Sequence, residues 1–436
     1  MSILDFLILY EHKQRELENS CLLKCELEKR GYSVKIDFFT SLSALMSKPK
    51  VLILPHLYDD FQVNFLIKNR SRKNLSVVDL QYEQILEGSE ENLKHHIPSE
   101  HAKNAYHIAW GDDQEKKYLK YNIPKDNIKK TGCISMDLNH PAFLKTFLTR
   151  EDLSEKYNIS KNKKWIMFFA NFTLSSWTKE RCAEFGRFCG FEDLYLKKQK
   201  YMIETQNVLI EWITKFMDNN DDYVFIYRPH PSEQVIDSVK KLSEKYPNFI
   251  INNDYSIRQW ISVADLFYTY YSTSLCDVYF QNKYCGIVRP VDVPENITAE
   301  IMDGAQYIRT YDDFLYSIKN YQDMPFPIKK EKVEYYYGNF DDGKAFERVA
   351  DVCVEALKNS RNYYNYDIKK ESYTERIKTF VAYCCLSLSK YISIFSILNN
   401  FSNNKHIAKN AILSKKELYK VPNEIRRMCK KFNKII

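Results

Sequence analysis

Glycine is scarce in this chain of 436 residues, which has only ten. No two of them fall at the spacing GxGxxG, and none forms a GxxxxGK motif followed by Ser or Thr. The sequence therefore has neither a dinucleotide-binding fingerprint nor a P-loop. Any phosphate that the protein binds must be held by helix ends and side chains instead.

Clustered cysteine and metal motifs are also missing. The eleven cysteines form no CxxC pair and no group with histidine at zinc spacing. We see no compelling Asp-x-Asp motif, so we expect no metal and no other cofactor. The first residues, MSILDFLILYEHK, lack a basic start and have too short an apolar run for a signal peptide. These absences predict a reducing, cytoplasmic setting with free, mostly buried thiols.

Apolar runs alternate with helical patterns in the first third of the chain. We expect strands at 3–10, 32–39, 50–55, 75–86, 106–111 and 129–133. Such alternation is typical of a parallel sheet with helices on its faces. We therefore predict a Rossmann-like N-terminal domain over about 1–145 and a second Rossmann-like domain over 146–360.

The most informative stretch of the sequence runs over 223–290. YVFIYRPHPSE is interpreted as a buried strand whose end delivers Arg228 and His230 to a surface, with two prolines that stiffen the exit. LFYTYY, over 266–271, is a second buried strand, and YCGIVRP is a third. Strand, helix and strand at this spacing predict a parallel βαβ unit. We expect the first two of these strands to be neighbours in the sheet.

Hydroxyl side chains follow the second of these strands. Ser272, Thr273 and Ser274 stand at the start of a helix that carries Asp277. Ligands of parallel sheets bind outside the carboxyl ends of the strands, and a helix N-terminus attracts phosphate. A capped helix beside a Pro-rich turn gives the same pattern without a ligand. We favour a phosphate site because Arg228 and a histidine end the other strand.

At these residues the chain resembles a known group of proteins. YRPHP followed by TYYSTSLCD is similar to the C-terminal half of GT-B transferases that build bacterial surface polymers. The resemblance is to the CDP-glycerol glycerophosphotransferases of teichoic acid synthesis and to surface carbohydrate biosynthesis proteins. The former carry a T-D-Y-S-S-x-x-x-D segment. This chain has Tyr270 at the first Asp of that segment, and it keeps Thr269, Tyr271, Ser272 and Asp277.

The resemblance implies a fold and a set of site residues. The fold is α/β and GT-B-like, with two Rossmann-like domains whose parallel sheets face a cleft, plus a C-terminal helical, basic tail. The donor would contact Asn171, Arg228, Ser272, Thr273, Ser274 and Asp277. The resemblance gives His230 the role of a donor of a proton or hydrogen bond to the leaving phosphate. Glu83, expected at a strand end that faces the cleft, would be the base for the acceptor hydroxyl.

Three functions are consistent with this sequence. The first is a glycosyltransferase that moves a sugar from a nucleotide-activated donor to a lipid-linked or polymer glycan acceptor of the bacterial surface. The second is a CDP-polyol phosphotransferase of the same fold, which the tyrosine at position 270 disfavours. The third is a non-catalytic membrane scaffold in a polysaccharide assembly complex. No feature of the sequence predicts binding to nucleic acid.

The last part of the chain differs in charge from the rest. Residues 365–436 hold 15 Lys or Arg and 5 Asp or Glu, a net charge of +10, which leaves −3 on the remainder. The apolar segment 380–398 is interrupted by Lys390 and is short for a membrane span. A packed helical appendage is one interpretation. We favour a basic amphipathic element that lies on the inner, anionic face of the cytoplasmic membrane.

Overall fold

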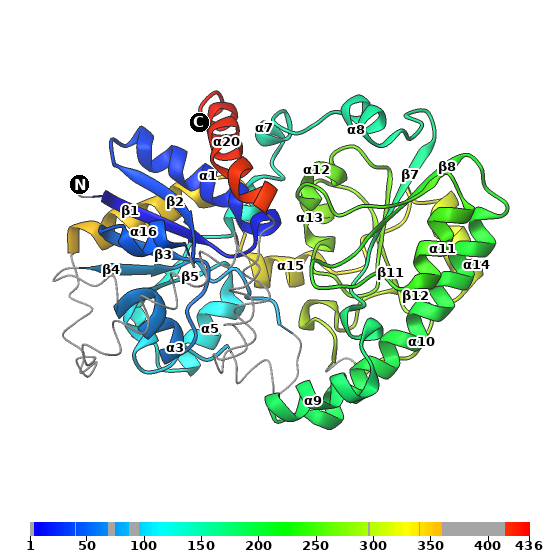
Figure 1. Ribbon diagram of the computed structural model, residues 1–436, viewed down its shortest axis with the longest axis horizontal. Coiled ribbons are helices and arrows are strands. Elements are labelled where there is room, and N and C mark those ends of the chain that lie inside the picture. The colour runs from blue at the N-terminus through cyan, green and yellow to red at the C-terminus, as the bar shows by residue number, and fades with distance from the viewer. Residues whose placement is uncertain are drawn as a thin grey trace. The chain divides into compact units, whose positions relative to one another are not determined.

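The computed structural model describes residues 4–39, 41–68, 75–86, 96–294, 297–339, 341–359 and 415–436. The chain divides into two compact units, and each contains a sheet of six strands with helices packed against it (Figure 1). Unit 1 comprises Met1–Gln84, His96–Leu138 and Tyr337–Ile436. Unit 2 comprises Ile85–His95 and Asn139–Tyr336.

The sheet of unit 1 has the strand order β2-β1-β3-β4-β5-β6, and all its pairs are parallel. Its strands are β1 (Leu4–Tyr10), β2 (Val34–Phe38), β3 (Pro49–Leu54), β4 (Ser76–Asp79), β5 (Tyr106–Ala109) and β6 (Ile128–Lys130). Strands covered on both faces read as nearly continuous apolar runs, which is why β1 and β3 could be recognised in the sequence. All six expected strands are present.

Helices of unit 1 connect these strands. The α-helices are α1 (Lys13–Lys29), α2 (Leu42–Met46), α3 (Asp60–Gln62), α5 (Asp112–Lys120), α6 (Ile134–Asp137), α16 (Ala345–Asn359) and α20 (Lys415–Phe432). Shorter or irregular turns are η1 (Val63–Lys68), η2 (Ala102–Asn104) and η3 (Lys125–Asn127). Helix α16 packs against α1 and against β4, so the segment that follows unit 2 in sequence belongs to unit 1.

The sheet of unit 2 is also parallel, with the order β12-β11-β10-β7-β8-β9. Its strands are β7 (Lys164–Phe169), β8 (Tyr223–Arg228), β9 (Phe249–Ile251), β10 (Leu266–Thr269), β11 (Cys285–Val288) and β12 (Tyr307–Ile308). In chain order this is 6-5-4-1-2-3, the arrangement of dinucleotide-binding Rossmann folds. The expected βαβ unit is confirmed, because β10 and β11 are parallel neighbours joined through a helix.

Helices of unit 2 follow the same alternation. They are α7 (Pro141–Leu144), α8 (Arg150–Tyr157), α9 (Lys179–Cys189), α10 (Glu192–Met217), α11 (Asp237–Lys245), α12 (Ile257–Ile261), α13 (Leu275–Phe280), α14 (Tyr311–Lys319) and α15 (Lys330–Tyr337), with the short turns η4 (Thr173–Ser176) and η6 (Glu300–Met302). Helix α8 begins with a capping box in which Thr149 and Asp152 satisfy each other's backbone N–H groups.

The C-terminal helix α20 packs against α1. Val421, Cys429 and Phe432 are buried, and Lys13 of α1 lies 2.8 Å from the Glu424 carboxylate. The last helix is therefore a packed appendage of unit 1. The apolar segment 380–398 lies outside the described residues. Among the helices that the structure describes, none is long and apolar enough to cross a bilayer.

Close packing between β10 and β11 leaves no room for a side chain at Gly286. A methyl group there would lie 2.7 Å from the Tyr268 ring and 2.7 Å from the Ile308 side chain. We predict that Gly286→Ala lowers the free energy of unfolding by about 1–3 kcal/mol, because an overpacked core forces its neighbours from their preferred rotamers. Urea unfolding measures this cost. An unchanged midpoint and slope would contradict the close approach of these strands.

Candidate functional site

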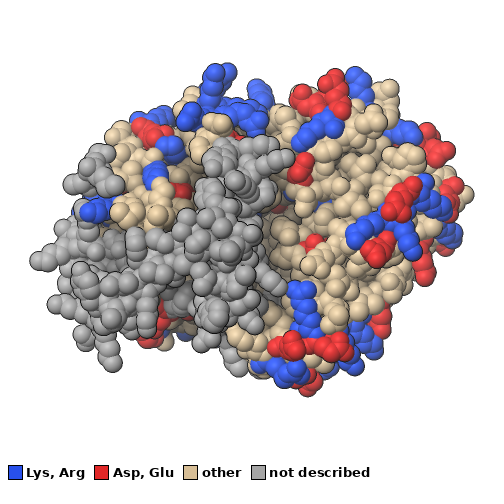
Figure 2. Space-filling model, in the orientation of Figure 1, with Lys and Arg blue, Asp and Glu red and all other residues tan. Residues whose placement is uncertain are grey.

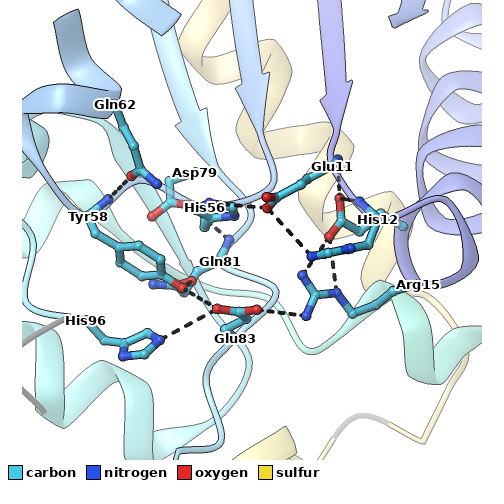
Figure 3. A network of polar contacts seen from close by, with 11 residues as sticks. Glu11, His12, Arg15, His56, Tyr58, Gln62, Asp79, Gln81, Glu83 and His96 are labelled. Carbon is cyan, nitrogen blue, oxygen red and sulfur yellow. Dashed lines mark hydrogen bonds and ion pairs between the residues drawn. The ribbon is translucent and has the colours of Figure 1, made fainter. Parts of the chain in front are cut away.

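In unit 1 the strand order reverses between β1 and β3, since the chain passes from β1 to β2 on one side and then to β3 on the other. Open parallel sheets bind ligands at such a switch point, outside the carboxyl ends of the strands. Glu11 and His12 directly follow β1, and His56 and Tyr58 follow β3. These side chains gather with Arg15, Gln81, Glu83 and His96 in one polar network (Figure 3).

A buried carboxylate holds the first loop of this network. Glu16 has no solvent-exposed surface, and its carboxylate accepts the backbone N–H groups of Glu11 at 2.7 Å and His12 at 3.2 Å. The same carboxylate accepts a hydrogen bond from Nη2 of Arg15 at 2.8 Å. Nη1 of Arg15 then donates to Oε1 of Glu83 at 2.8 Å. Glu16 thus fixes the direction of the arginine that contacts Glu83.

Glu83 is surrounded by hydrogen-bond donors. Besides Arg15, its Oε2 accepts the Tyr58 hydroxyl at 3.3 Å and lies 3.6 Å from Nε2 of His96. Burial raises the pKa of Glu83, but the His96 hydrogen bond and the charges of Arg15 and His56 outweigh it and hold the pKa well below its usual value. A carboxylate with so low a pKa is a weak base. The base role expected for Glu83 stays a prediction, and this environment counts against it.

A second layer of buried groups supports the network. The single proton of the Tyr58 hydroxyl is shared between Oε1 of Gln81 at 2.8 Å, the shorter contact, and Oε2 of Glu83 at 3.3 Å. The backbone N–H of Gln81 donates to Oδ1 of Asp79 at 3.0 Å. Oδ2 of Asp79 lies 2.8 Å from Nδ1 of His107, and neither side chain is exposed. Gln81 has a φ of +45°, a left-handed conformation that residues other than glycine rarely adopt. Strain of this kind is typical of functional loops.

The histidines of this network surround a second carboxylate and an aromatic ring. Oε2 of Glu11 lies 3.6 Å from Nε2 of His56 and 3.9 Å from Nε2 of His12. The Tyr58 ring stacks on the His56 ring, with centroids 5.1 Å apart, and meets the His96 ring edge-on at 4.8 Å. Such a mixture of carboxylates, imidazoles and a guanidinium can bind the hydroxyl and phosphate groups of a polar substrate.

The sequence indicated only part of this network. It singled out Glu83. The charged residues after the first strand, such as Glu11 and Arg15, are equally consistent with an exposed helix start, so the sequence does not select them. His56 and His96 were missed. A signal was present for His56, which directly follows the apolar run of β3, where parallel strands present ligand-binding side chains.

In unit 2 the strand order reverses between β7 and β10. Asn171 follows the end of β7, and Ser272, Thr273 and Ser274 follow the end of β10. Phe169, the last residue of β7, pairs with Thr269, the last residue of β10. The two polar loops therefore begin side by side at the carboxyl edge of the sheet. These four predicted donor-binding residues are all partly exposed there.

The hydroxyl loop has local hydrogen bonds of its own. The backbone N–H of Ser272 donates to Oγ1 of Thr269 at 2.9 Å, and that of Ser274 donates to Oγ of Ser272 at 3.3 Å. Helix α13 starts after Ser274 and has six residues, so its dipole is weaker than that of a long helix. Any phosphate bound at this loop would therefore be held by side chains more than by the dipole of α13.

Arg228 and His230 do not follow a strand adjacent to β10. The expectation that these two strands are neighbours is wrong, because β7 lies between β8 and β10. The guanidinium of Arg228 donates to the carbonyl oxygens of Asp254 at 2.9 Å and Tyr255 at 2.6 Å, which braces the loop before α12. His230 is exposed, and its Nδ1 accepts the backbone N–H of Ser232 at 3.2 Å.

Glu233 is a residue of this site that sequence reasoning missed. Its Oε2 accepts the backbone N–H of Phe172 at 2.9 Å and that of His230 at 3.3 Å, and its Oε1 accepts the Tyr227 hydroxyl at 2.7 Å. Burial raises the pKa of Glu233, and these hydrogen bonds oppose the increase. The carboxylate ties the loop after β7 to the loop after β8, so it determines how Asn171 and His230 lie.

Asp277 is a buried structural residue of unit 2. Its Oδ1 accepts Nδ2 of Asn139 at 2.9 Å and lies 3.4 Å from Nη1 of Arg258. Tyr270, which stands where the resembling family has an aspartate, is buried with its ring stacked on Phe172 at 5.2 Å. The contacts with Asn139 and Arg258 already use Oδ1 of Asp277. The donor-binding role expected for this residue stays a prediction.

Comparisons with known proteins agree with this fold. The wall teichoic acid polymerase TagF soaked with CDPG superposes with a TM-score of 0.55 at 13% identity, over 81% of this chain and 89% of that one. A UDP-N-acetylglucosamine 2-epimerase gives 0.50 at 14% identity, over 85% and 99%. UDP-GlcNAc 2-epimerase from Neisseria meningitidis, bound to UDP-GlcNAc, gives 0.49 at 12%, over 81% and 100%. No family model matches the chain, and no curated protein matches its sequence.

Likeness at this level of identity defines a fold class. Two Rossmann-like units with parallel six-stranded sheets, in a chain that superposes on these enzymes along most of its length, have the GT-B fold. Within the described residues, no group of three or more His, Cys, Asp or Glu side chains could hold a metal ion. Independence from metals stays a prediction.

The low pKa of Glu83 leads to a prediction about stability and pH. Because its folded-state pKa lies below the unfolded value, its contacts stabilise the fold above the unfolded pKa of about 4.3 and lose this effect as the pH falls through the folded pKa. We expect Glu83→Gln to lower the melting temperature at pH 7, and the difference from the wild type to shrink below about pH 4. Exposed Glu244→Gln is the control. A difference that stays constant from pH 7 to pH 3 would contradict the depressed pKa.

Proposed function

We propose that the protein is a glycosyltransferase that moves a sugar from a nucleotide-activated donor to a growing bacterial surface polysaccharide. The observation that carries the proposal is the switch point of unit 2. There Asn171 and the Ser272–Ser274 loop follow the ends of two neighbouring strands, β7 and β10, whose last residues are paired. Folds with this strand order bind nucleotides at the corresponding edge of the sheet. Two proteins that share the fold support a nucleotide-linked donor, since one is a UDP-N-acetylglucosamine 2-epimerase and the other was soaked with CDPG.

The transfer makes one bond and breaks one bond. The acceptor hydroxyl oxygen bonds to the anomeric carbon of the sugar, the bond from that carbon to the phosphate oxygen breaks, and the hydroxyl proton passes to a base. Negative charge grows on the leaving phosphate, so donors fixed around it stabilise the transition state more than the ground state. We assign this role to His230, with Ser272, Thr273 and Ser274 as hydrogen-bond donors to the phosphates.

The network of unit 1 is assigned to the acceptor. Glu83 is the base that the resemblance implies, but its low pKa suits a different task better. Held by Arg15 and Tyr58, its carboxylate can accept hydrogen bonds from sugar hydroxyls and orient the acceptor. His56 and His12, which surround Glu11, have the imidazole nitrogen atoms that proton transfer near neutral pH requires.

Transfer of a polyol phosphate is the second candidate. The likeness to the wall teichoic acid polymerase favours it, because the two chains share the fold over most of their length. Tyr270 disfavours it. The family has a carboxylate at this position, whereas here a phenol ring packs against Phe172 in the core and cannot serve as an acid or base on a substrate.

The experiment that tests the proposal is nucleotide release from CMP-, CDP- and UDP-linked donors. Release from a sugar donor supports a glycosyltransferase, and release of CMP from CDP-glycerol supports the second candidate. An isomerised donor without release would indicate an epimerase. If no donor binds or reacts, the proposal is wrong and a scaffold role takes its place.

For the active donor we predict that His230→Ala lowers turnover by about 10²–10⁴-fold, since general acid catalysis by one side chain contributes that much. The control is His101→Ala, which removes an exposed imidazole from unit 1. Single-turnover kinetics with saturating donor separate chemistry from binding. Turnover equal to that of the wild type would reduce His230 to a structural residue.

The outer face of α20 supports a location at an anionic membrane. Arg426, Arg427 and Lys430 of α20 are exposed, as is Lys434 just after the helix, while the opposite side of the helix packs against α1. Figure 2 shows Lys and Arg side chains gathered over this helix. An anionic leaflet attracts each such residue by about 1 kcal/mol. We propose that this face brings the enzyme to a lipid-linked acceptor.

We predict that the full chain binds liposomes containing phosphatidylserine at low salt and that 0.5 M NaCl releases it, because salt screens exposed charges. Changing the four basic residues of this face to Gln should abolish binding without lowering the melting temperature. Gln substitutions at Lys240 and Lys241, exposed in unit 2, are the matched control. Equal binding of the α20 variant and the wild type would show that this face has no part in membrane association.

A further inference from the structure

An arginine that makes no ion pair with the described residues is buried beside the switch point of unit 2. Arg289 directly follows β11, and its side chain is almost fully buried, with 1% of the residue exposed. Ile287 of β11 pairs with Thr269 of β10, so two residues further on Arg289 lies beside the segment that leads into the Ser272–Ser274 loop. The side chains of Tyr307, Tyr270 and Asp303 are close enough to interact electrostatically with the guanidinium.

The guanidinium of Arg289 has few polar contacts. Its Nε and Nη1 atoms are buried and have no hydrogen-bond partner among the described residues. Nη2 lies 3.9 Å from the sulfur of Met302, and the Tyr307 ring lies 4.2 Å from the guanidinium carbon. A sulfur atom and an aromatic face stabilise a buried cation far less than a carboxylate does.

Arg258, which is also buried in unit 2, shows the usual arrangement. Its Nη1 lies 3.4 Å from the carboxylate of Asp277, so the charge is compensated inside the fold. Arg289 has no carboxylate within ion-pair distance among the described residues. Burial accordingly lowers the pKa of Arg289. The carboxylate of Asp303 acts on the guanidinium only from beyond ion-pair distance. A buried charge without a direct ion pair destabilises a protein, so its presence in a folded chain needs an explanation.

We propose that Arg289 binds a phosphate group of the nucleotide donor, which provides the missing counter-charge. This inference rests on the proposed function, and it extends the donor site by one strand, from β7 and β10 to β11. A guanidinium donates several hydrogen bonds in a planar array that matches phosphate oxygens. The long side chain can turn its free nitrogen atoms toward the carboxyl edge of the sheet. The Ser272–Ser274 loop then provides hydroxyl groups to the same phosphates.

The proposal has a consequence for the protein without ligand. If Arg289 binds a phosphate, its buried charge lowers the free energy of unfolding of the protein without ligand. Replacing it with methionine, an apolar side chain of similar length, removes that cost and keeps most of the volume. The variant should therefore be more stable than the wild type and should bind anions more weakly. A residue that only packs the core would show the reverse behaviour.

The test compares Arg289→Met with the wild type and with Arg309→Met. Arg309 is the matched control, because its guanidinium lies against the same Tyr307 ring at 5.1 Å but is exposed and paired with Asp292 at 3.1 Å. Binding of UDP, CDP and inorganic pyrophosphate is measured by calorimetry on the full chain. Thermal unfolding of the ligand-free proteins is measured in parallel.

We expect Arg289→Met to weaken the binding of these probes by about 10- to 100-fold, as the loss of hydrogen bonds to a charged group does. We also expect it to raise the melting temperature of the ligand-free protein, and Arg309→Met to change neither quantity. Unchanged affinity in Arg289→Met overturns the proposal. A loss of affinity that comes with a lower melting temperature also overturns it, because a structural residue gives that result.

The same measurements separate this inference from the proposed function. If the wild type releases nucleotide from a donor and Arg289→Met binds UDP and CDP normally, the inference is wrong and the function stands. If the wild type binds none of the probes and reacts with no donor, both are wrong.

Discussion

The parallel register of the sheet in unit 2 is the constraint on which the proposed donor site depends. Phe169, at the end of β7, pairs with Arg228 on one side and with Thr269 on the other, so three loops leave the sheet at the same level. Each loop then needs only short-range interactions to position its side chains. Glu233 provides one of them by accepting N–H groups from the loops after β7 and β8. If the register slipped by one residue, every side chain would change face and the site would be lost.

Unit 1 uses the same principle with a different set of residues. Its strand order also reverses, and the loops after β1, β3 and β4 bring imidazole, guanidinium and carboxylate groups together. The buried carboxylate of Glu16 holds this network in place, because it orients both the backbone after β1 and the side chain of Arg15. The low pKa of Glu83 follows from that arrangement. Under the proposed function, these fixed charges would hold the acceptor without rearrangement of the network.

The sequence predicted the fold well because buried parallel strands leave an unmistakable pattern of apolar runs, as in VLIL of β3. It also predicted that Ser272–Ser274 would follow a strand. It did not predict that β7 separates β8 from β10, since the pairing of strands depends on contacts between distant segments. Arg15 and Glu83 are 68 residues apart, and no local pattern records their contact. Arg289 could not be recognised either, because its burial without an ion pair to the described residues is a property of the folded chain.

The central claim is that the carboxyl edge of the sheet in unit 2 binds the nucleotide donor. Hydrogen–deuterium exchange of the full chain, with and without saturating UDP or CDP, tests it most directly. Bound nucleotide should slow exchange in peptides that cover the loops after β7 and β10, at residues 170–176 and 270–275, while peptides from α11 on the outside of the unit exchange as before. Protection that is absent from both loops, in a protein shown by calorimetry to bind the nucleotide, would contradict the account.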